Sequence, residues 1–262
     1  MARAAPRHDR DAGGDPELLA AKARLREEVW SALEQAGASR FPGAKGRIPN
    51  FVGAEAAAER LRETDEWASA ATVKANPDAP QWPVRQRALE DGKTLFMAVP
   101  RLADPRPFFR LDSDRLRTTP RKASSIKGAS AAGRKVDLDE LEPVELVVSG
   151  CVAVGEDGAR LGKGGGFGDL ELALAAAAGL VGPDTVVATT VHDLQVRPPG
   201  TVPCADHDVA VDLVVTPTRV IRPRPGRGRG RRALPRLRWE ELTEEKVAAI
   251  PLLASLRRGD GG

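Results

Sequence analysis

Short apolar runs recur along most of this chain and are separated by polar or amphipathic segments. Residues 94–100, 146–154 and 185–191 are almost continuously apolar or β-branched. Such runs are typical of strands that are buried on both faces of a parallel sheet. Two further strands are predicted at 71–75 and within 209–221.

Segments with helical periodicity lie between these runs. Residues 16–33 are the longest, with Asp15 placed as N-cap and Pro16 as the first helical residue. Strands that alternate with helices predict an α/β fold, here a three-layer α/β/α sandwich around a mainly parallel sheet. Further helices are predicted at 54–62, 83–91 and 169–178.

Other stretches have less regular patterns. Residues 101–135 are polar and basic with little periodicity, so we expect a partly mobile excursion there. Gly150 lies inside the 146–154 run, which leaves open one strand or two. Residues from Trp239 are amphipathic up to Pro251, and we expect this tail to dock on the domain. The predicted organisation is a disordered leader (1–15), an α/β domain (16–221), a basic linker (222–238) and a C-terminal helical tail (239–262).

Composition describes an ordinary globular protein. Of the 262 residues 41% are hydrophobic and 29% charged, and the net charge is +3. Cys151 and Cys204 have no metal-ligand spacing, which favours a reducing cytoplasm, and no apolar run is long enough to span a membrane. Residues 222–238 hold eight arginines and no acid. A run of this kind is either a linker or a non-specific nucleic-acid contact, and no recognised nucleic-acid-binding motif accompanies it.

The stretch with the most chemistry is 158–169, GARLGKGGGFGD. Five glycines lie between Gly162 and Gly168, and the stretch stands between a predicted strand and a predicted helix. That order brings free backbone N–H groups and the positive end of a helix dipole to one point, beside Arg160 and Lys163. Glycine allows the close approach that a phosphate requires. The alternative is a flexible surface loop with a solvated lysine.

Several other charged residues admit two interpretations. Lys22 and Arg26 are spaced i, i+4 on the first predicted helix, so they form either a solvated face or one side of an anion site. Asp169 is either a helix N-cap or a metal ligand, and Asp208 either a turn residue or a metal ligand. His192 follows a predicted strand and is either structural or a site residue.

Three blocks of sequence resemble the 5-formyltetrahydrofolate cyclo-ligase family. They are Lys22–Arg26, the glycine stretch 158–169 (similar to G-x-R-L-G-x-G-x-G-Y-Y-D) and residues 206–212 (DHDVAVD). The chain is more similar still to the branch called methenyltetrahydrofolate synthetase domain-containing proteins. The blocks of that branch are 47–53 (RIPNFVG), 93–95 (KTL), 100–102 (PRL), 162–164 (GKG), 169–171 (DLE), 191–193 (VHD) and 213–221 (LVVTPTRVI).

The resemblance implies a three-layer α/β/α fold and a reaction that uses MgATP. The formyl oxygen of 5-formyltetrahydrofolate is phosphorylated, N10 attacks, and phosphate leaves to give 5,10-methenyltetrahydrofolate. This chemistry needs charge stabilisation and alignment rather than a covalent nucleophile. The expected partners are the small molecules folate and ATP rather than a membrane or nucleic acid, and the protein is expected to be a monomer or a homodimer.

Residue roles follow from the resemblance position by position. Arg160 and Lys163 are implied to be catalytic, and Asp169 and Asp208 to hold Mg²⁺. Asp78 and His192 are implied to lie on the folate side. Nucleotide contacts are implied for Lys22, Arg26, Gly162, Gly164, Gly165, Gly166, Phe167 and Gly168.

Two departures from the family pattern keep other functions open. Phe167 and Gly168 stand where the family has two tyrosines, and Asp78 has no E-x-x-T pattern around it. The alternatives are therefore a nucleotide-binding relative with a different ligase activity or none, and a nucleic-acid-binding protein that uses the arginine-rich segment.

Overall fold

The computed structural model describes residues 15–164, 166–205, 208–223 and 235–259. The leader up to residue 14, Gly165, and most of the predicted basic linker lie outside the described residues. So do the first two residues of the 206–212 block. Asp15 is described, and its carboxylate accepts the backbone N–H of Glu17 as N-cap of the first helix.

The centre of the described fold is an eight-stranded sheet in the order β11-β10-β8-β5-β1-β2-β3-β4. The neighbours from β10 to β2 are parallel, whereas β11, β3 and β4 join by antiparallel pairing. The predicted mainly parallel sheet is therefore confirmed. Its strands are β1 (Thr72–Ala75), β2 (Thr94–Ala98), β3 (Phe108–Asp112), β4 (Arg134–Val136), β5 (Leu146–Val148), β8 (Val186–Thr190), β10 (Leu213–Val215) and β11 (Val220–Ile221).

A second, three-stranded sheet explains the glycine inside the 146–154 run. The run is two strands: β5 belongs to the large sheet, and β6 pairs with β7 and β9. At Gly150 an added Cβ would lie 2.8 Å from both Gln81 Oε1 and Ile48 Cγ2, so only glycine fits at this change of sheet. The small sheet consists of β6 (Ala153–Gly155), β7 (Arg160–Leu161) and β9 (Val196–Arg197).

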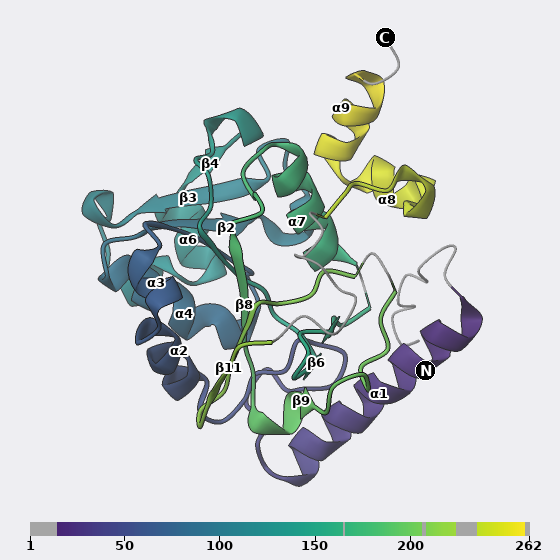
Figure 1. Cartoon of the computed structure of the whole chain (residues 1–262). Coiled ribbons are helices and arrows are strands. Elements are labelled where there is room, and N and C mark those ends of the chain that lie inside the picture. Colours follow the sequence, from purple (N-terminus) through teal and green to yellow (C-terminus); the bar gives the residue numbers. More distant parts are fainter. Residues whose placement is uncertain (1–14, 165, 206–207, 224–234, 260–262) are drawn as a thin grey trace, which may run out of the picture.

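Helical layers cover both faces of the large sheet, which confirms the α/β/α expectation (Figure 1). Alternate residues of each strand enter one of two cores, as Val73 and Ala75 do on one face and Val147 on the other. One face carries α2 (Ala54–Arg62), α3 (Asp65–Ser69), α4 (Trp82–Glu90), α5 (Pro120–Ala123) and α6 (Ile126–Ala132). The other carries α7 (Phe167–Ala177) and the small sheet, on which α1 (Pro16–Gln35) packs.

Two expectations need correction. Residues 101–135 are not an irregular excursion, because they supply β3, α5, α6 and the start of β4. Their apolar residues are spaced too widely for a periodic signal, yet Phe109 and Leu111 are buried in the core. The predicted strand within 209–221 is a hairpin, in which β10 and β11 pair antiparallel around Pro217.

The C-terminal tail returns to the domain, as its pattern predicts. It forms α8 (Glu244–Ala249) and α9 (Pro251–Gly259). Pro251 does not end the helical segment but starts its second helix, a position that proline favours. Val247, Ile250 and Leu253 are buried against α7 and the strands β2–β4. No helix among the described residues is long and apolar enough to cross a membrane.

Candidate functional site

The glycine stretch connects β7 to α7. Gly164 has φ 104° and Gly166, the N-cap, has φ 63°, a left-handed backbone that residues with side chains rarely adopt. The helix begins at Phe167, two residues earlier than predicted, so Asp169 lies in its first turn and is not the N-cap. The loop thus ends on the open backbone N–H groups of a helix N-terminus.

This N-terminus lies at the carboxyl ends of β1 and β5. A Cβ on Gly168 would lie 3.8 Å from Nδ2 of Asn76, which follows β1, and 4.0 Å from Oγ of Ser149, which follows β5. Parallel α/β sheets bind ligands at this edge. The strand directly before the loop is β7, which belongs to the small sheet. The loop therefore leads from the small sheet to this edge of the large sheet, where α7 begins.

Arg160 is a buried cation that contacts the first turn of α7 and the backbone next to the loop. Its side chain is 4% exposed; it contacts the carboxylate of Asp169 and donates to the backbone oxygens of Gly150 (3.3 Å) and Val209 (3.4 Å). Burial opposes the guanidinium charge, but the nearby negative charges, Asp169 foremost and Asp208 as well, together with the hydrogen bond to Asp169, outweigh burial and raise the pKa of Arg160. A fixed positive charge therefore stays beneath the glycine loop.

Two cations of α1 reach the same loop from another side. Lys22 Nζ lies 2.5 Å from Asp208 Oδ2, and Arg26 Nε donates to the backbone oxygen of Gly162 at 2.8 Å. The guanidinium carbon of Arg26 is 3.5 Å from the position of a Cβ on Gly164. The i, i+4 pair is therefore not a solvated face, because Lys22 is paired with Asp208 and Arg26 contacts the loop.

Lys163 is the cation within the loop. Its Nζ donates to Asp78 Oδ1 at 3.2 Å, and its side chain is 44% exposed. Asp78 follows β1, so this pair joins the loop to the strand edge. The exposure of Lys163 leaves its ammonium accessible to a ligand.

Two predicted residues face elsewhere. His192 accepts the backbone N–H of Leu194 through Nδ1 and packs its ring 6.1 Å from that of Phe51. Burial lowers the pKa of His192. Phe167 is packed with the C-terminal tail, where Lys246 Nζ lies 5.2 Å from its ring centre. Neither has a described contact with the cations around the loop.

The predicted metal ligands are separately paired. Asp169 contacts Arg160, and Asp208 contacts Lys22. Within the part of the chain that the structure describes, no group of three or more His, Cys, Asp or Glu side chains could hold an ion. The two carboxylates fit a Mg²⁺ ion only if it arrives with other oxygen ligands, as it does on a nucleotide triphosphate.

Sequence reasoning missed a buried polar group beside the loop. Lys74 of β1 lies 3.0 Å from Glu171 of α7, and Asn76 donates to the same carboxylate oxygen at 3.4 Å. Burial raises the pKa of Glu171. The signal was available, because a lysine in the middle of a fully buried strand requires a partner.

Comparisons with known proteins agree with the fold and with the motifs. A sequence model of the 5-formyltetrahydrofolate cyclo-ligase family matches residues 17–217. The chain is 38% identical over 256 residues to a methenyltetrahydrofolate synthase domain-containing protein of Bos taurus, covering 93% of this chain and 63% of that protein. Its human counterpart is 36% identical over 249 residues, with coverages of 90% and 61%. The chain therefore spans less than two thirds of these relatives.

A solved structure has the same fold. The NMR structure of Aquifex aeolicus 5,10-methenyltetrahydrofolate synthetase superposes with a TM-score of 0.50 over 80% of this chain and 96% of that one. The two sequences are 20% identical, so this likeness concerns the fold.

Proposed function

Because the chain belongs to the 5-formyltetrahydrofolate cyclo-ligase family, a family of ligases, we propose that it converts 5-formyltetrahydrofolate to 5,10-methenyltetrahydrofolate with ATP and Mg²⁺. The observation that carries the proposal is the cluster of cations around one helix N-terminus. Arg26 contacts the loop, and Arg160 and Lys163 belong to the glycine stretch itself. Lys22 pairs with Asp208, whose neighbour Val209 accepts a hydrogen bond from Arg160. A triphosphate is the ligand that best matches this charge and these backbone donors.

The chain's own groups would act by position and charge. The loop N–H groups and the start of α7 would bind phosphate oxygens, and Lys163 would neutralise the charge that develops as the phosphoryl group moves to the formyl oxygen. Lys22 and Arg26 would hold the triphosphate from α1. Mg²⁺ held by Asp169 and Asp208 would supply further charge neutralisation.

The folate side is a separate part of the proposal. Asp78 stands next to Lys163 at the end of β1, which supports a place for the folate beside the transferred phosphoryl group. Phosphorylation makes the formyl oxygen a leaving group, so N10 can close the ring as phosphate departs. His192, at the end of β8, remains a predicted substrate contact.

The test is a spectrophotometric assay of purified protein with 5-formyltetrahydrofolate and MgATP. Absorbance of 5,10-methenyltetrahydrofolate should rise only when ATP is present, and Lys163→Ala should slow it strongly. Lys127→Ala, an exposed lysine on α6, serves as the matched control and should behave as wild type. Folded wild-type protein that forms no product at high concentration would refute the proposal.

One observation favours a second candidate, a nucleotide-binding relative with a different ligase activity or none. Where the family has two tyrosines, this chain has Gly168 and a phenylalanine, and the ring of Phe167 packs with the tail. Calorimetry separates the two candidates. The second requires binding of MgATP without binding of 5-formyltetrahydrofolate.

A further inference from the structure

The buried face of α4 carries one charged side chain. That face is apolar at Val84, Ala88 and Leu89, whereas Arg85 on the same face is 2% exposed. Burial lowers the pKa of the Arg85 guanidinium to about 10, although the charge of Asp78 acts in the opposite direction. The guanidinium therefore stays positively charged at neutral pH. A charge removed from water is costly, so its place in an apolar face requires polar partners.

The partners of Arg85 are backbone oxygens of two segments. Its Nη1 group donates to the carbonyl oxygens of Asn76 at 2.5 Å and Asp78 at 3.1 Å. Its Nε group donates to the carbonyl oxygen of Ser124, the C-cap of α5, at 2.8 Å. A guanidinium can hold several acceptors at once because its donors form a rigid planar fork. Arg85 therefore joins the turn after β1 to α4 and to the end of α5.

The turn that Arg85 holds carries Asp78. This residue stands directly before the short helix η1 (Ala79–Gln81), yet its side chain does not cap that helix. Its carboxylate instead accepts a hydrogen bond from Lys163 Nζ at 3.2 Å. The direction of the Asp78 carboxylate is thus set by the backbone of the turn, which Arg85 contacts on both sides of residue 77.

Stability alone does not account for a charge at this position. Buried ionic groups can often be replaced by apolar residues of similar volume without loss of stability. The attachment of α4 to α5 also has a second source, because Trp82 Nε1 donates to Ser124 Oγ at 2.9 Å and to the carbonyl oxygen of Arg121 at 3.1 Å. What Arg85 adds is the attachment of the turn at residues 76–78, the segment that reaches the glycine loop.

We propose that Arg85 is a positioning residue, which directs Asp78 toward Lys163 and the folate through the backbone of residues 76–78. The inference rests on the proposed function and extends it to a residue of the opposite helical layer. A displaced Asp78 would weaken folate binding and misalign the groups that exchange the phosphoryl group. The contacts of Lys22 and Arg26 do not involve this turn, so binding of ATP should be retained.

Arg85→Lys tests this role, because lysine keeps the positive charge but lacks the planar fork. In steady-state assays of the full chain, the KM for 5-formyltetrahydrofolate should rise about fivefold and kcat should fall about tenfold. The KM for ATP should stay within about twofold of the wild-type value. Trp82→Phe is the matched control. It removes two hydrogen bonds to α5 but leaves those to the turn, so all three constants should stay at wild-type values.

A double-mutant cycle separates positioning from a general loss of structure. Asp78→Asn alone should raise the KM for the folate. If Arg85 acts through Asp78, then adding Arg85→Lys to Asp78→Asn should change that KM by less than about twofold. Effects that multiply independently would indicate a structural role and overturn the inference. Arg85→Gln buries no charge and repeats the cycle if Arg85→Lys does not fold.

The outcomes separate this inference from the proposed function. Wild-type kinetic constants in folded Arg85→Lys would overturn the positioning role while leaving the cyclo-ligase proposal intact. A parallel rise in the KM values for the folate and for ATP would also overturn it, since that pattern indicates a disturbed loop. Folded wild-type protein that forms no product would overturn both.

Discussion

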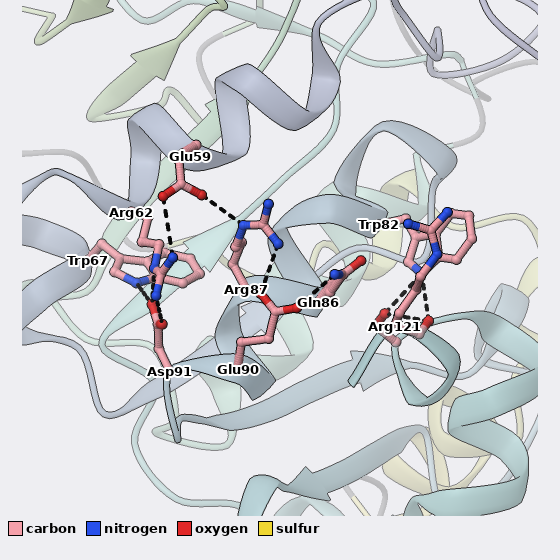
Figure 2. Close-up of polar contacts among 10 residues, drawn as sticks. Glu59, Arg62, Trp67, Trp82, Gln86, Arg87, Glu90, Asp91 and Arg121 are labelled. Atoms are coloured by element: carbon pink, nitrogen blue, oxygen red, sulfur yellow. Dashed lines mark hydrogen bonds and ion pairs between the residues drawn. The ribbon is translucent and has the colours of Figure 1, made fainter. Parts of the chain in front are cut away.

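Two polar regions of this molecule lie in the helical layers on opposite faces of the large sheet, and they differ in how their charges are paired. Figure 2 shows the first, a network over α2 and α4 in which Arg62 pairs with Asp91 (2.6 Å) and Arg87 with Glu59 (2.8 Å). The two pairs join residues 29 and 28 positions apart in the sequence. The side chains of Arg62 and Glu59 are more than 40% exposed. Solvent screens such pairs, so each contributes little to folding.

The second region is the group of charges around the glycine loop. There Arg160 is 4% exposed, and Lys22 pairs with Asp208 across 186 positions of sequence. Charges removed from water need fixed partners and act strongly on whatever binds beside them. The comparison teaches that pairing alone does not mark a site. A desolvated charge such as that of Arg160 does so when it lies beside a loop that ends on the N-terminus of a helix.

The largest expected effect lies on the loop. Lys163→Ala should lower kcat about 10²-fold, because charge stabilisation of phosphoryl transfer is lost. Its unfolding free energy should change by less than about 0.5 kcal/mol, since the side chain is 44% exposed. Steady-state kinetics and urea denaturation measure the two quantities. Arg87→Ala, taken from the exposed network, should leave kcat unchanged. An equal loss of kcat in both variants would contradict the assignment of the catalytic charge to the loop.

The next largest effect is a difference in unfolding free energy between variants of the two regions. Asp169→Asn leaves the buried Arg160 without its carboxylate and should lower the unfolding free energy by about 2 kcal/mol. Glu59→Gln should lower it by less than about 1 kcal/mol. Urea denaturation followed by circular dichroism compares them. Similar losses of unfolding free energy in the two variants would mean that the buried pair contributes no more to stability than the exposed one.

The pH dependence of the exposed network has a defined sign. Burial opposes the charge of Asp91, but hydrogen bonds from Arg62 and Trp67 and the positive charges of Arg62 and Lys93 together outweigh it. The pKa of Asp91 therefore lies below its ordinary value of 3.8. Its contribution is fully present above pH 3.8 and is lost as pH falls through the lower, folded-state pKa. The stability gap between wild type and Asp91→Asn should therefore be constant at neutral pH and close under acid. A gap that widens on acidification would contradict this assignment.

The smallest expected effect compares two cations over aromatic rings at the same distance. Lys246 lies 5.2 Å from the ring centre of Phe167, and Arg121 lies 5.2 Å from that of Trp82. Alanine at either position should lower stability by about 0.5–1 kcal/mol. Only Lys246→Ala should also raise the KM for ATP, by about twofold, because Phe167 begins the helix that ends the loop. Unchanged ATP kinetics would show that the tail does not influence the loop.

Local patterns predicted those parts of the fold that depend on neighbours in sequence. The helix at Pro16 has its N-cap and proline, and the buried strands have their apolar runs, because both signals arise within a few residues. The glycine loop was found for the same reason. The pattern could not reveal β3 and β4, whose residues become part of the core only because β3 pairs with β2 and β4 pairs with β3.

By itself the sequence determined that this is an α/β protein with a glycine-rich loop before a helix, and which charged residues are available to that loop. Only the tertiary structure decided which charges meet. It paired Lys22 with Asp208 and Arg160 with Asp169, and it packed Phe167 against the tail. It also joined Lys74 and Asn76 to Glu171. The physical reason is that secondary structure follows from local conformational preference, whereas burial and charge pairing depend on contacts between segments far apart in the chain.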